Sequence, residues 1–295
     1  MNLATPFIAA ASLSEARLAG QGLEFAVFKA TSPTHGPVAL RVPKKKVYHN
    51  VNDPSTDAGD LIRQELRIYE LLRDSPVPVP KPFGYLEVDG YPAMLCEFVD
   101  DDGTEASPAE LGRVAALIHS IPLPRGWDTG LMAHEKEADA LTALVERMQR
   151  RFRELAREEP GAESWIAERD GLAPIADGLR RLPSALCHMD LRNVNVRHRG
   201  GRITAVIDWS NAMVGPSVID IFRILEYGEH SDVFLQTYTQ ILSLPPVSRR
   251  EETFLRLDAA LMLALVFISE APDPERRVAT VKRVEELSRA LRGSS

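Results

Sequence analysis

The sequence predicts an α+β fold in two parts, a small strand-rich part over residues 1–98 and a larger, mainly helical part over residues 99–295. Short apolar runs bounded by turn residues, which are typical of strands, concentrate before residue 100. Apolar residues at helical spacing dominate the remainder. Three successive aspartates and Gly103 interrupt both patterns, so we place the connection near residues 97–103.

The N-terminal part is expected to begin with a helix and a hairpin. Ser12 and Glu15 have capping-box spacing and Gly20 follows them, which predicts a short helix there. Residues 25–30 and 38–42 are apolar runs joined by a turn-rich segment, and we interpret them as a β-hairpin.

One helix and three more strands are predicted from apolar patterning. Over residues 60–73 apolar side chains recur at helical spacing, and four prolines prevent continuation: Pro76, Pro78, Pro80 and Pro82. The apolar segment 91–99 predicts a strand. Two shorter strands are expected at residues 185–188 and 203–209.

Most of the C-terminal part is expected to be helical. Ser107, Pro108 and Glu110 fit the N-cap, the first-turn proline and the capping-box glutamate of one helix. Residues 141–155 repeat the helical period. The arginines between the apolar positions of this second helix are expected to form its solvated face: Arg147, Arg150, Arg151 and Arg153.

Composition and charge exclude several classes of protein. With 35 Lys+Arg against 42 Asp+Glu the net charge is −7, and an acidic chain lacks the basic face that nucleic-acid binding requires. The longest apolar run, residues 259–268, is too short to cross a membrane and predicts a buried helix. No secretory signal precedes Arg17, so we expect a cytoplasmic protein. Cys96 and Cys187 are expected to be buried thiols.

One segment carries residues suited to chemistry. His188, Asp190 and Asn195 form His-x-Asp-x-x-x-x-Asn, the pattern of a kinase catalytic loop, and Asp208 follows on a predicted strand. Asp190 can accept the proton of an attacking hydroxyl, and the side-chain oxygens of Asn195 and Asp208 suit Mg²⁺. We place His188 and Arg192 with Asp190 in the catalytic loop, His188 as a scaffold histidine. A polar turn with Asx capping is the alternative interpretation.

Around this segment the sequence resembles the aminoglycoside phosphotransferase-like family of small-molecule kinases. Ile-Asp-Trp at Asp208 is similar to the metal-binding strand of that family, and residues 215–220 resemble its Gly-Asp-Pro-x-x-Asp segment, in which Asp220 would be structural. Residues 111–119 resemble its helix ending in Leu-His, and residues 76–85 its Pro-Val-Pro linker. The resemblance implies a two-lobed protein-kinase-like fold, a nucleotide donor and Mg²⁺.

The resemblance also places a nucleotide site in the N-terminal lobe. The Gly-x-Gly turn at Gly22, with Phe25 after it, would cover phosphates, although an ordinary hairpin turn fits equally. Arg41 and Glu65 take the positions of the kinase lysine and its helix glutamate. Since arginine and lysine differ in reach and geometry, the alternative is a solvated Arg41 with Lys44 in its role.

Three further features follow from the same resemblance. The base is expected against the backbone of Glu97, Phe98 and Val99, where the strand leaves the N-terminal lobe. Arg192 stands where protein kinases carry a phosphate-directed lysine, and phosphate contact and surface exposure are equal alternatives for it. Met189 replaces the usual glycine of the family.

A finer resemblance is to the macrolide phosphotransferase branch, which also has arginine at the position of Arg41. It rests on residues 22–28, 38–43 and 207–212. It implies transfer of a γ-phosphoryl group from GTP or ATP to a macrolide hydroxyl, with an aminoglycoside as the next candidate. The alternatives are a metabolite kinase for a sugar or amino alcohol, and an inactive nucleotide-binding module.

The charge distribution predicts a cationic, hydroxyl-bearing acceptor bound in the helical lobe. Residues 1–98 carry a net charge of −1 and the remaining residues carry −6. An acidic lobe attracts amine-bearing small molecules. The oligomeric state is left open.

Overall fold

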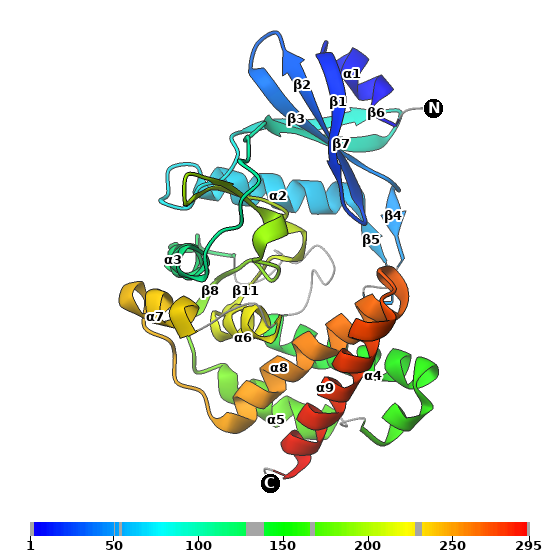
Figure 1. Ribbon diagram of the computed structural model, residues 1–295, viewed down its shortest axis with the longest axis vertical. Coiled ribbons are helices and arrows are strands. Elements are labelled where there is room, and N and C mark those ends of the chain that lie inside the picture. Colours follow the sequence, from blue (N-terminus) through cyan, green and yellow to red (C-terminus); the bar gives the residue numbers. More distant parts are fainter. Residues whose placement is uncertain are drawn as a thin grey trace.

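The structure is a computed structural model that describes residues 3–49, 51–52, 55–127, 139–165, 169–227 and 232–293. A twisted β-sheet forms one end of the molecule, and helices form the other end (Figure 1). This arrangement confirms the predicted α+β architecture, with a small sheet first and a mainly helical part after it.

The sheet has five antiparallel strands in the order β1-β2-β3-β7-β6. Their bounds are Ser14–Gln21, Phe25–Ser32, Gly36–Pro43, Tyr91–Glu97 and Pro82–Val88 for β1, β2, β3, β7 and β6. The predicted hairpin and the strand over 91–99 are therefore confirmed, whereas β6 was not predicted. Along β3, Val38, Leu40 and Val42 join one core, while Ala39 and Arg41 line a cleft on the other face. This is the alternation that a strand imposes.

The predicted opening helix at Ser12 is wrong. A shorter helix, α1 (Thr5–Ala10), comes before it, and β1 occupies the predicted segment. The Glu15 side chain accepts a hydrogen bond from the Thr31 hydroxyl of β2 at 3.0 Å instead of closing a capping box. Pairing with β2 satisfies the backbone of this segment, so tertiary contact overrides the local cap signal.

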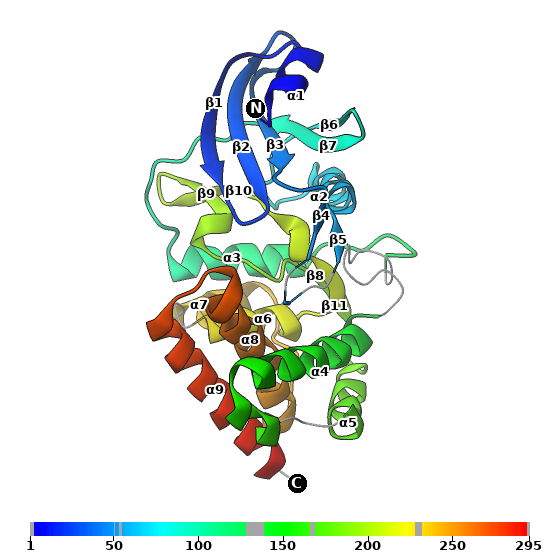
Figure 2. The same cartoon turned by 90° about the vertical axis from the view of Figure 1, so that its right-hand side faces the viewer.

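Helix α2 (Ala58–Leu72) confirms the helix predicted over 60–73 and lies between the sheet and the helical part (Figure 1, Figure 2). Asp57 caps it by accepting hydrogen bonds from the amides of Gly59 and Asp60. Ahead of it, Val47–Tyr48 (β4) and Thr56–Asp57 (β5) form a small two-stranded sheet. The helix thereby spans the junction between the lobes.

The helical part contains the two helices predicted from N-cap and periodicity signals. Ser107 Oγ accepts a hydrogen bond from the Glu110 amide at 3.2 Å at the start of α3. The helices are α3 (Pro108–His119), α4 (Ala140–Glu158), α5 (Arg169–Leu179), α6 (Val218–Glu226), α7 (Asp232–Ile241), α8 (Arg249–Leu265) and α9 (Pro274–Gly293). A π-helical turn, Val266–Glu270, follows α8.

Two short antiparallel strand pairs separate α5 from α6. Strand β8 (Ser184–Cys187) pairs with β11 (Met213–Pro216), and β9 (Val196–Arg199) pairs with β10 (Arg202–Val206). The predicted strand over 203–209 ends early because Asp208 adopts a left-handed conformation, with φ 63° and ψ 63°. Strand β11 was not predicted. The C-terminal helices therefore begin after β11 and not directly after β10.

The predicted solvated face of α4 is wrong for two of its arginines. Arg147 and Arg151 are only 6% and 2% exposed, whereas Arg153 is exposed. Arg151 Nη1 donates to Asp258 Oδ1 of α8 at 2.8 Å. Because neighbouring helices pack on both sides of α4, a polar stripe at helical spacing faces the interior here.

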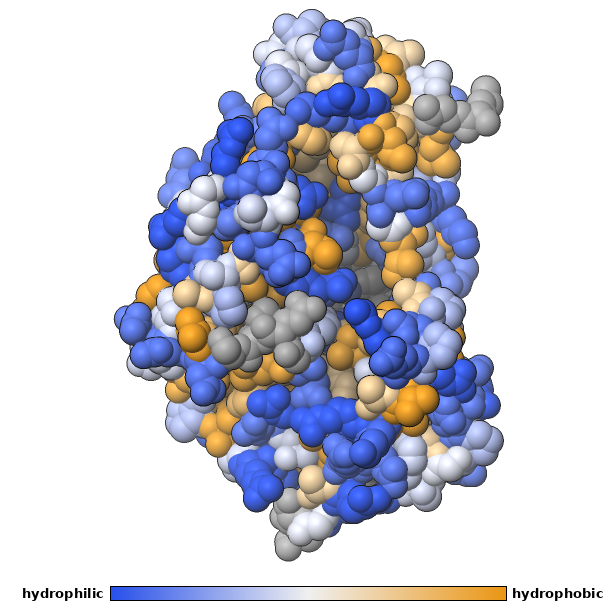
Figure 3. All heavy atoms as spheres, viewed as in Figure 1, coloured by the Kyte–Doolittle hydropathy of each residue, from blue (hydrophilic) through white to orange (hydrophobic). Residues whose placement is uncertain are grey.

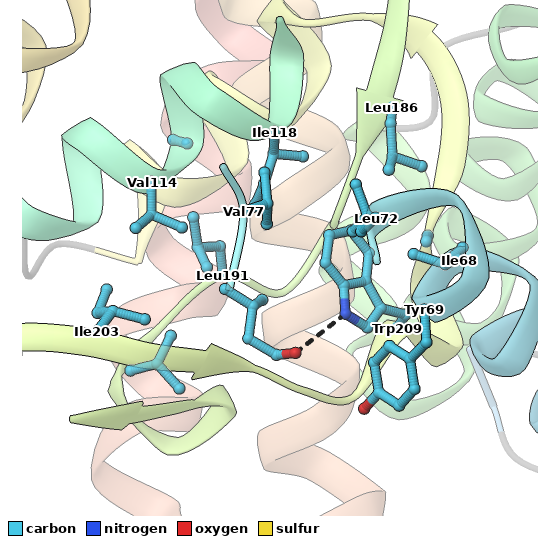
Figure 4. Close-up of a cluster of buried hydrophobic side chains, with 14 of the residues drawn as sticks. Ile68, Tyr69, Leu72, Val77, Val114, Ile118, Leu186, Leu191, Ile203 and Trp209 are labelled. Carbon is cyan, nitrogen blue, oxygen red and sulfur yellow. Dashed lines mark hydrogen bonds between the residues drawn. The ribbon is translucent and has the colours of Figure 1, made fainter. Parts of the chain in front are cut away.

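A buried apolar cluster fixes the strands that carry the catalytic-loop motif. Trp209 packs against the α2 residues Ile68, Tyr69 and Leu72, as Figure 4 shows. The indole Nε1 of Trp209 donates to the Val206 carbonyl at 3.2 Å. The segment around Asp208 is therefore held from both sides by core packing.

Cys96 and Cys187 are buried free thiols, as predicted. Burial raises the pKa of Cys96 to about 12, so this thiol stays protonated at neutral pH. Among the described residues, no helix is long and apolar enough to cross a membrane.

The contact between α3 and α7 depends on Gly112. A Cβ atom there would lie 2.4 Å from the backbone oxygen of Phe234, which cannot rotate away. We expect Gly112→Ala to destabilise the fold by about 1–3 kcal/mol, the usual cost of overpacking. Thermal unfolding measures this change. The matched control is Gly171→Ala in α5, where the space is open and alanine should stabilise by up to about 1 kcal/mol. Equal unfolding midpoints for the two variants would contradict the prediction.

Candidate active site

A cleft of about 1510 Å³ lies between the sheet and the helical part, and Figure 3 shows the surface hollowed there. Eleven of the twelve predicted site residues line it: Gly22, Phe25, Arg41, Glu65, Glu97, Phe98, Val99, Asp190, Arg192, Asn195 and Asp208. The exception is His188. The tertiary structure therefore brings together residues separated by more than 150 positions in the sequence.

A buried guanidinium connects the two lobes at the centre of the cleft. Arg41 on β3 donates from Nη1 to Glu65 Oε2 on α2 and from Nη2 to Asp208 Oδ1 at 2.7 Å. The same Nη2 lies 3.3 Å from Ser210 Oγ. The planar fork of arginine allows one side chain to meet both carboxylates.

Desolvation and the charge of Arg41 together shift the pKa values of Glu65 and Asp208. Desolvation raises the pKa of Glu65, and the charge of Arg41 opposes that shift. Desolvation also acts to raise the pKa of Asp208, but the Arg41 charge and hydrogen bonds from Ser210 and Arg41 outweigh it and lower the pKa. Asp208 is therefore a carboxylate at neutral pH, which a cation ligand must be.

The alternative in which Lys44 replaces Arg41 does not fit the contacts. Lys44 donates to the Gly22 carbonyl, whereas Glu65 is held by Arg41 in the described structure. The turn at Gly22 closes the β1–β2 hairpin through its amide, which donates to the Phe25 carbonyl at 2.9 Å. The Phe25 ring lies 4.0 Å from Arg41 Cζ, a cation–π contact. The turn is thus both an ordinary hairpin and part of the cleft wall.

Asp190 lies at the floor of the cleft with its carboxylate held by three side chains. Oδ1 accepts from Arg192 Nε and from the Tyr227 hydroxyl, each at 2.9 Å. Oδ2 accepts from Asn195 Nδ2 at 2.7 Å and from Arg192 Nη2 at 3.3 Å. A carboxylate has about four lone-pair directions, so an incoming hydroxyl must displace one donor. The Arg192 side chain is 45% exposed and is the donor most able to leave.

The backbone of the catalytic loop is fixed by Asp220 at the start of α6. Its fully buried carboxylate accepts from the amides of His188 and Met189 at 2.8 and 2.9 Å and from His119 Nε2 at 3.2 Å. Met189 has φ 67°, a left-handed conformation that costs a side-chain-bearing residue about 1–2 kcal/mol. The left-handed backbone explains why the family has glycine at the position of Met189. It also explains why the hydrogen bonds to Asp220 are needed to stabilise this conformation here. The structural role implied for Asp220 is confirmed by these contacts.

His188 is fully buried and does not line the cleft. Its Nδ1 accepts from the Asp190 amide at 3.2 Å, so Nε2 carries the proton and donates to the Ile207 carbonyl at 3.0 Å. The ring packs 4.5 Å from that of Trp209. These contacts suit a scaffold histidine that joins the loop to the strand before Asp208.

The donor set at Asn195 and Asp208 fits a hard divalent cation such as Mg²⁺. Asn195 donates through Nδ2 to Asp190, which leaves its amide oxygen available. Asp208 uses Oδ1 toward Arg41 and Ser210, and its side chain is 41% exposed to the cleft. One amide oxygen and one carboxylate oxygen are ligands that Mg²⁺ prefers alongside phosphates and water.

The segment at Glu97, Phe98 and Val99 lines the cleft opposite the catalytic loop. The Glu97 amide donates to the Lys81 carbonyl at 2.8 Å, and the Phe98 amide donates to the Pro37 carbonyl at 3.3 Å. These two amides hold the connection in place. A base edge would therefore have to use other main-chain groups of the segment, such as the Val99 amide.

Two residues that hold the predicted groups in place were not themselves predicted. Tyr227 holds Asp190, and Gln64 Nε2 on α2 donates to the carbonyls of Trp209 and Ser210 at 2.8 and 3.1 Å. Gln64 could have been suspected from its place beside Glu65 on the buried face of α2. No local pattern marks Tyr227, since its partner lies 37 positions earlier.

The model of the phosphotransferase enzyme family matches residues 15–254, which cover most of the chain. The chain belongs to the phosphotransferase enzyme family. The predicted family is therefore confirmed at this level, while the macrolide branch stays a prediction. No curated protein sequence matches this chain.

Solved structures with a kinase-like fold align with nearly the whole chain. An aminoglycoside phosphotransferase in complex with ADP and hygromycin B has a TM-score of 0.61 at 16% identity, over 98% of each chain. A protein from Haemophilus somnus described as a fructosamine-3-kinase has a TM-score of 0.66 at 16% identity, over 98% of this chain and 95% of its own. A further aminoglycoside phosphotransferase, in complex with gentamicin, has a TM-score of 0.61 at 13% identity, over 96% of each chain. The predicted two-lobed kinase-like fold is confirmed.

Asp220 offers a direct test of how the loop is held. Asparagine keeps the shape but has only one acceptor oxygen, so one buried donor of the loop loses its partner. We expect Asp220→Asn to cost about 1–3 kcal/mol in the free energy of unfolding, measured by thermal denaturation. Asp177→Asn is the control, because that carboxylate is exposed and pairs only at the surface in the described structure. Similar unfolding midpoints for the two variants would show that the loop does not depend on Asp220.

Proposed function

We propose that this phosphotransferase moves the γ-phosphoryl group of ATP or GTP, with Mg²⁺, to a hydroxyl of a small molecule. The observation that carries the proposal is one cleft containing Asp190, Asn195, Asp208 and the Arg41–Glu65 pair. An inactive nucleotide-binding module would not need all of these groups.

Asp190 is the proposed general base. The acceptor hydroxyl gives its proton to the Asp190 carboxylate as its oxygen attacks the γ-phosphorus, and the bond from that phosphorus to the β,γ-bridging oxygen breaks. The products are the phosphorylated acceptor and ADP or GDP. Arg192, displaced from Asp190 by the acceptor, is within reach to meet the phosphoryl oxygens.

Asn195 and Asp208 are the proposed ligands of Mg²⁺, which neutralises phosphate charge when bound. Arg41 is proposed to hold the nucleotide phosphates, oriented by Glu65 as the kinase lysine is by its glutamate. The turn at Gly22 would cover the phosphates. The base would lie against residues 97–99.

Different observations support different predicted acceptor classes. The sequence favours a macrolide, then an aminoglycoside, and the similar proteins bound to hygromycin B and gentamicin support the aminoglycoside. The similar protein described as a fructosamine-3-kinase supports the metabolite kinase. Release of ADP or GDP with a panel of macrolides, aminoglycosides, sugars and amino alcohols, with mass analysis of the products, tests the function and separates these classes.

In that assay we expect Asp190→Ala to lower the turnover number by about 10²–10⁴-fold while nucleotide affinity is retained, because a general base acts in the transition state. Nucleotide affinity is measured by calorimetric titration. Asp177→Ala, at an exposed carboxylate, is the control for a general effect of removing charge. Full turnover in Asp190→Ala would remove Asp190 from this role.

A second comparison separates Arg41 from Lys44. We expect Arg41→Ala to raise the apparent Kd for nucleotide by about tenfold or more, since a charge-assisted contact is lost, and Lys44→Ala to change it little. Because Glu65 is left buried and unpaired, the folded fraction of each variant is checked by circular dichroism. Arg41→Lys should be intermediate, since the charge survives without the bidentate fork. A larger loss for Lys44→Ala would move the role to the lysine.

A further inference from the structure

The helical side of the cleft is basic, although the chain as a whole is acidic. Helices α4, α6, α8 and α9 and the π-helical turn contribute one carboxylate, Glu270, to the described cleft wall, against four arginines: Arg147, Arg151, Arg223 and Arg276. The net charge of the chain therefore does not describe this wall.

Three of these arginines are buried, and we call Arg147, Arg151 and Arg223 the arginine wall. They are 6%, 2% and 6% exposed. Arginine does not lose its charge in proteins, so each guanidinium brings a positive charge into a poorly solvated place. Such charges are costly unless anions accompany them.

The Asp258 carboxylate contacts two residues of the arginine wall. Its Oδ1 accepts from Arg151 at 2.8 Å, and its Oδ2 lies 3.6 Å from Arg223 Nη1. The distance between Arg223 and Asp258 is short enough for an ion pair but too long for a hydrogen bond. Asp258 therefore contacts both guanidinium groups.

Arg223 lines the cleft and retains donor capacity. Within the described part of the chain, its buried Nε and Nη1 make no hydrogen bond. Desolvation acts to lower the pKa of Arg223, but Tyr227, Asp258 and Asp190 raise it, so the group stays cationic. A buried, charged donor without an acceptor suits a site that is completed by a ligand.

Arg223 lies one helical turn from the residue that holds the proposed general base. Tyr227, which donates to Asp190, lies one helical turn after Arg223, and its amide donates to the Arg223 carbonyl at 3.3 Å. Residues four apart share one face of a helix and lie about 5–6 Å apart. Both residues line the cleft, so a molecule bound there would lie beside the two side chains.

We propose that the acceptor carries an anionic group, a carboxylate or a phosphate, which binds Arg223 and Arg151 while its hydroxyl meets Asp190. This inference rests on the proposed function and names the acceptor class. It predicts the opposite charge preference from the net charge of the helical lobe. The structural alternative is that the arginine wall only joins α4, α6 and α8 through Asp258.

The first experiment measures anion binding without any acceptor. The full chain, saturated with a non-hydrolysable ATP analogue and Mg²⁺ so that the nucleotide site is filled, is titrated calorimetrically with sodium sulfate against a sodium chloride control. We expect saturable sulfate binding that Arg223→Gln weakens at least about tenfold, since a charge-assisted contact is lost. Arg223→Lys should be intermediate and guards against a folding defect. Arg289→Gln is the matched control, because that side chain is 70% exposed.

The second experiment measures acceptor preference with matched compounds. Glycerate, glycerol 3-phosphate, glycerol and serinol compare a carboxylate, a phosphate, a neutral group and an amine on one skeleton, and gluconate, glucose and glucosamine repeat the comparison. One macrolide and one aminoglycoside complete the panel. We expect an anionic member to have at least about tenfold higher kcat/KM, and Arg223→Gln to raise its KM with little change in kcat. Glycerate and glycerol 3-phosphate distinguish the two anions.

The outcomes separate this inference from the proposed function. Absent sulfate binding, or a preference for neutral or cationic acceptors, would overturn the inference and leave the proposed function intact. Sulfate binding with no phosphoryl transfer to any compound in either panel would overturn both the acceptor assignment and the function, leaving only an anion site. Sulfate binding with an anionic acceptor preferred would support both.

Discussion

The buried Arg41 guanidinium is the interaction on which the arrangement of the site depends. It lies between Glu65 of the lobe-joining helix and Asp208 of the catalytic segment, and so ties the sheet, α2 and the helical lobe to one charge group. A buried cation of this kind is stable only while its carboxylates stay in place. The packing of Trp209 against α2 and the hydrogen bonds of Gln64 keep Asp208 at that position.

A second constraint acts on the catalytic loop. The left-handed backbone at Met189 directs the amides of His188 and Met189 toward Asp220, and the strain is offset by hydrogen bonds to this fully buried carboxylate. His188 extends this hold to the strand before Asp208. The acid proposed as general base and the acid proposed as metal ligand therefore stand on one rigid frame, as preorganised catalysis requires.

Charge is distributed unevenly in the cleft, and the proposed acceptor class rests on this local distribution rather than on the net charge. Exposed acids dominate the count over the helical lobe, but solvent and salt screen them. The arginine wall is buried and lines the same cleft as Asp190. Family membership leaves this question open, because the same fold carries acceptors of different chemistry.

The sequence by itself determined the two-part fold, the hairpin β2–β3, helices α2, α3 and α4, and the residues that meet in the cleft. These signals are local: periodicity, caps and short motifs need only neighbouring residues. Tertiary structure decided the rest. Pairing with β2 turned the expected helix at Ser12 into β1, and packing on both sides buried Arg147 and Arg151, because a helical period shows which residues share a face but not what covers it. The contact of Tyr227 with Asp190 also depends on chain reversal, which no local pattern encodes.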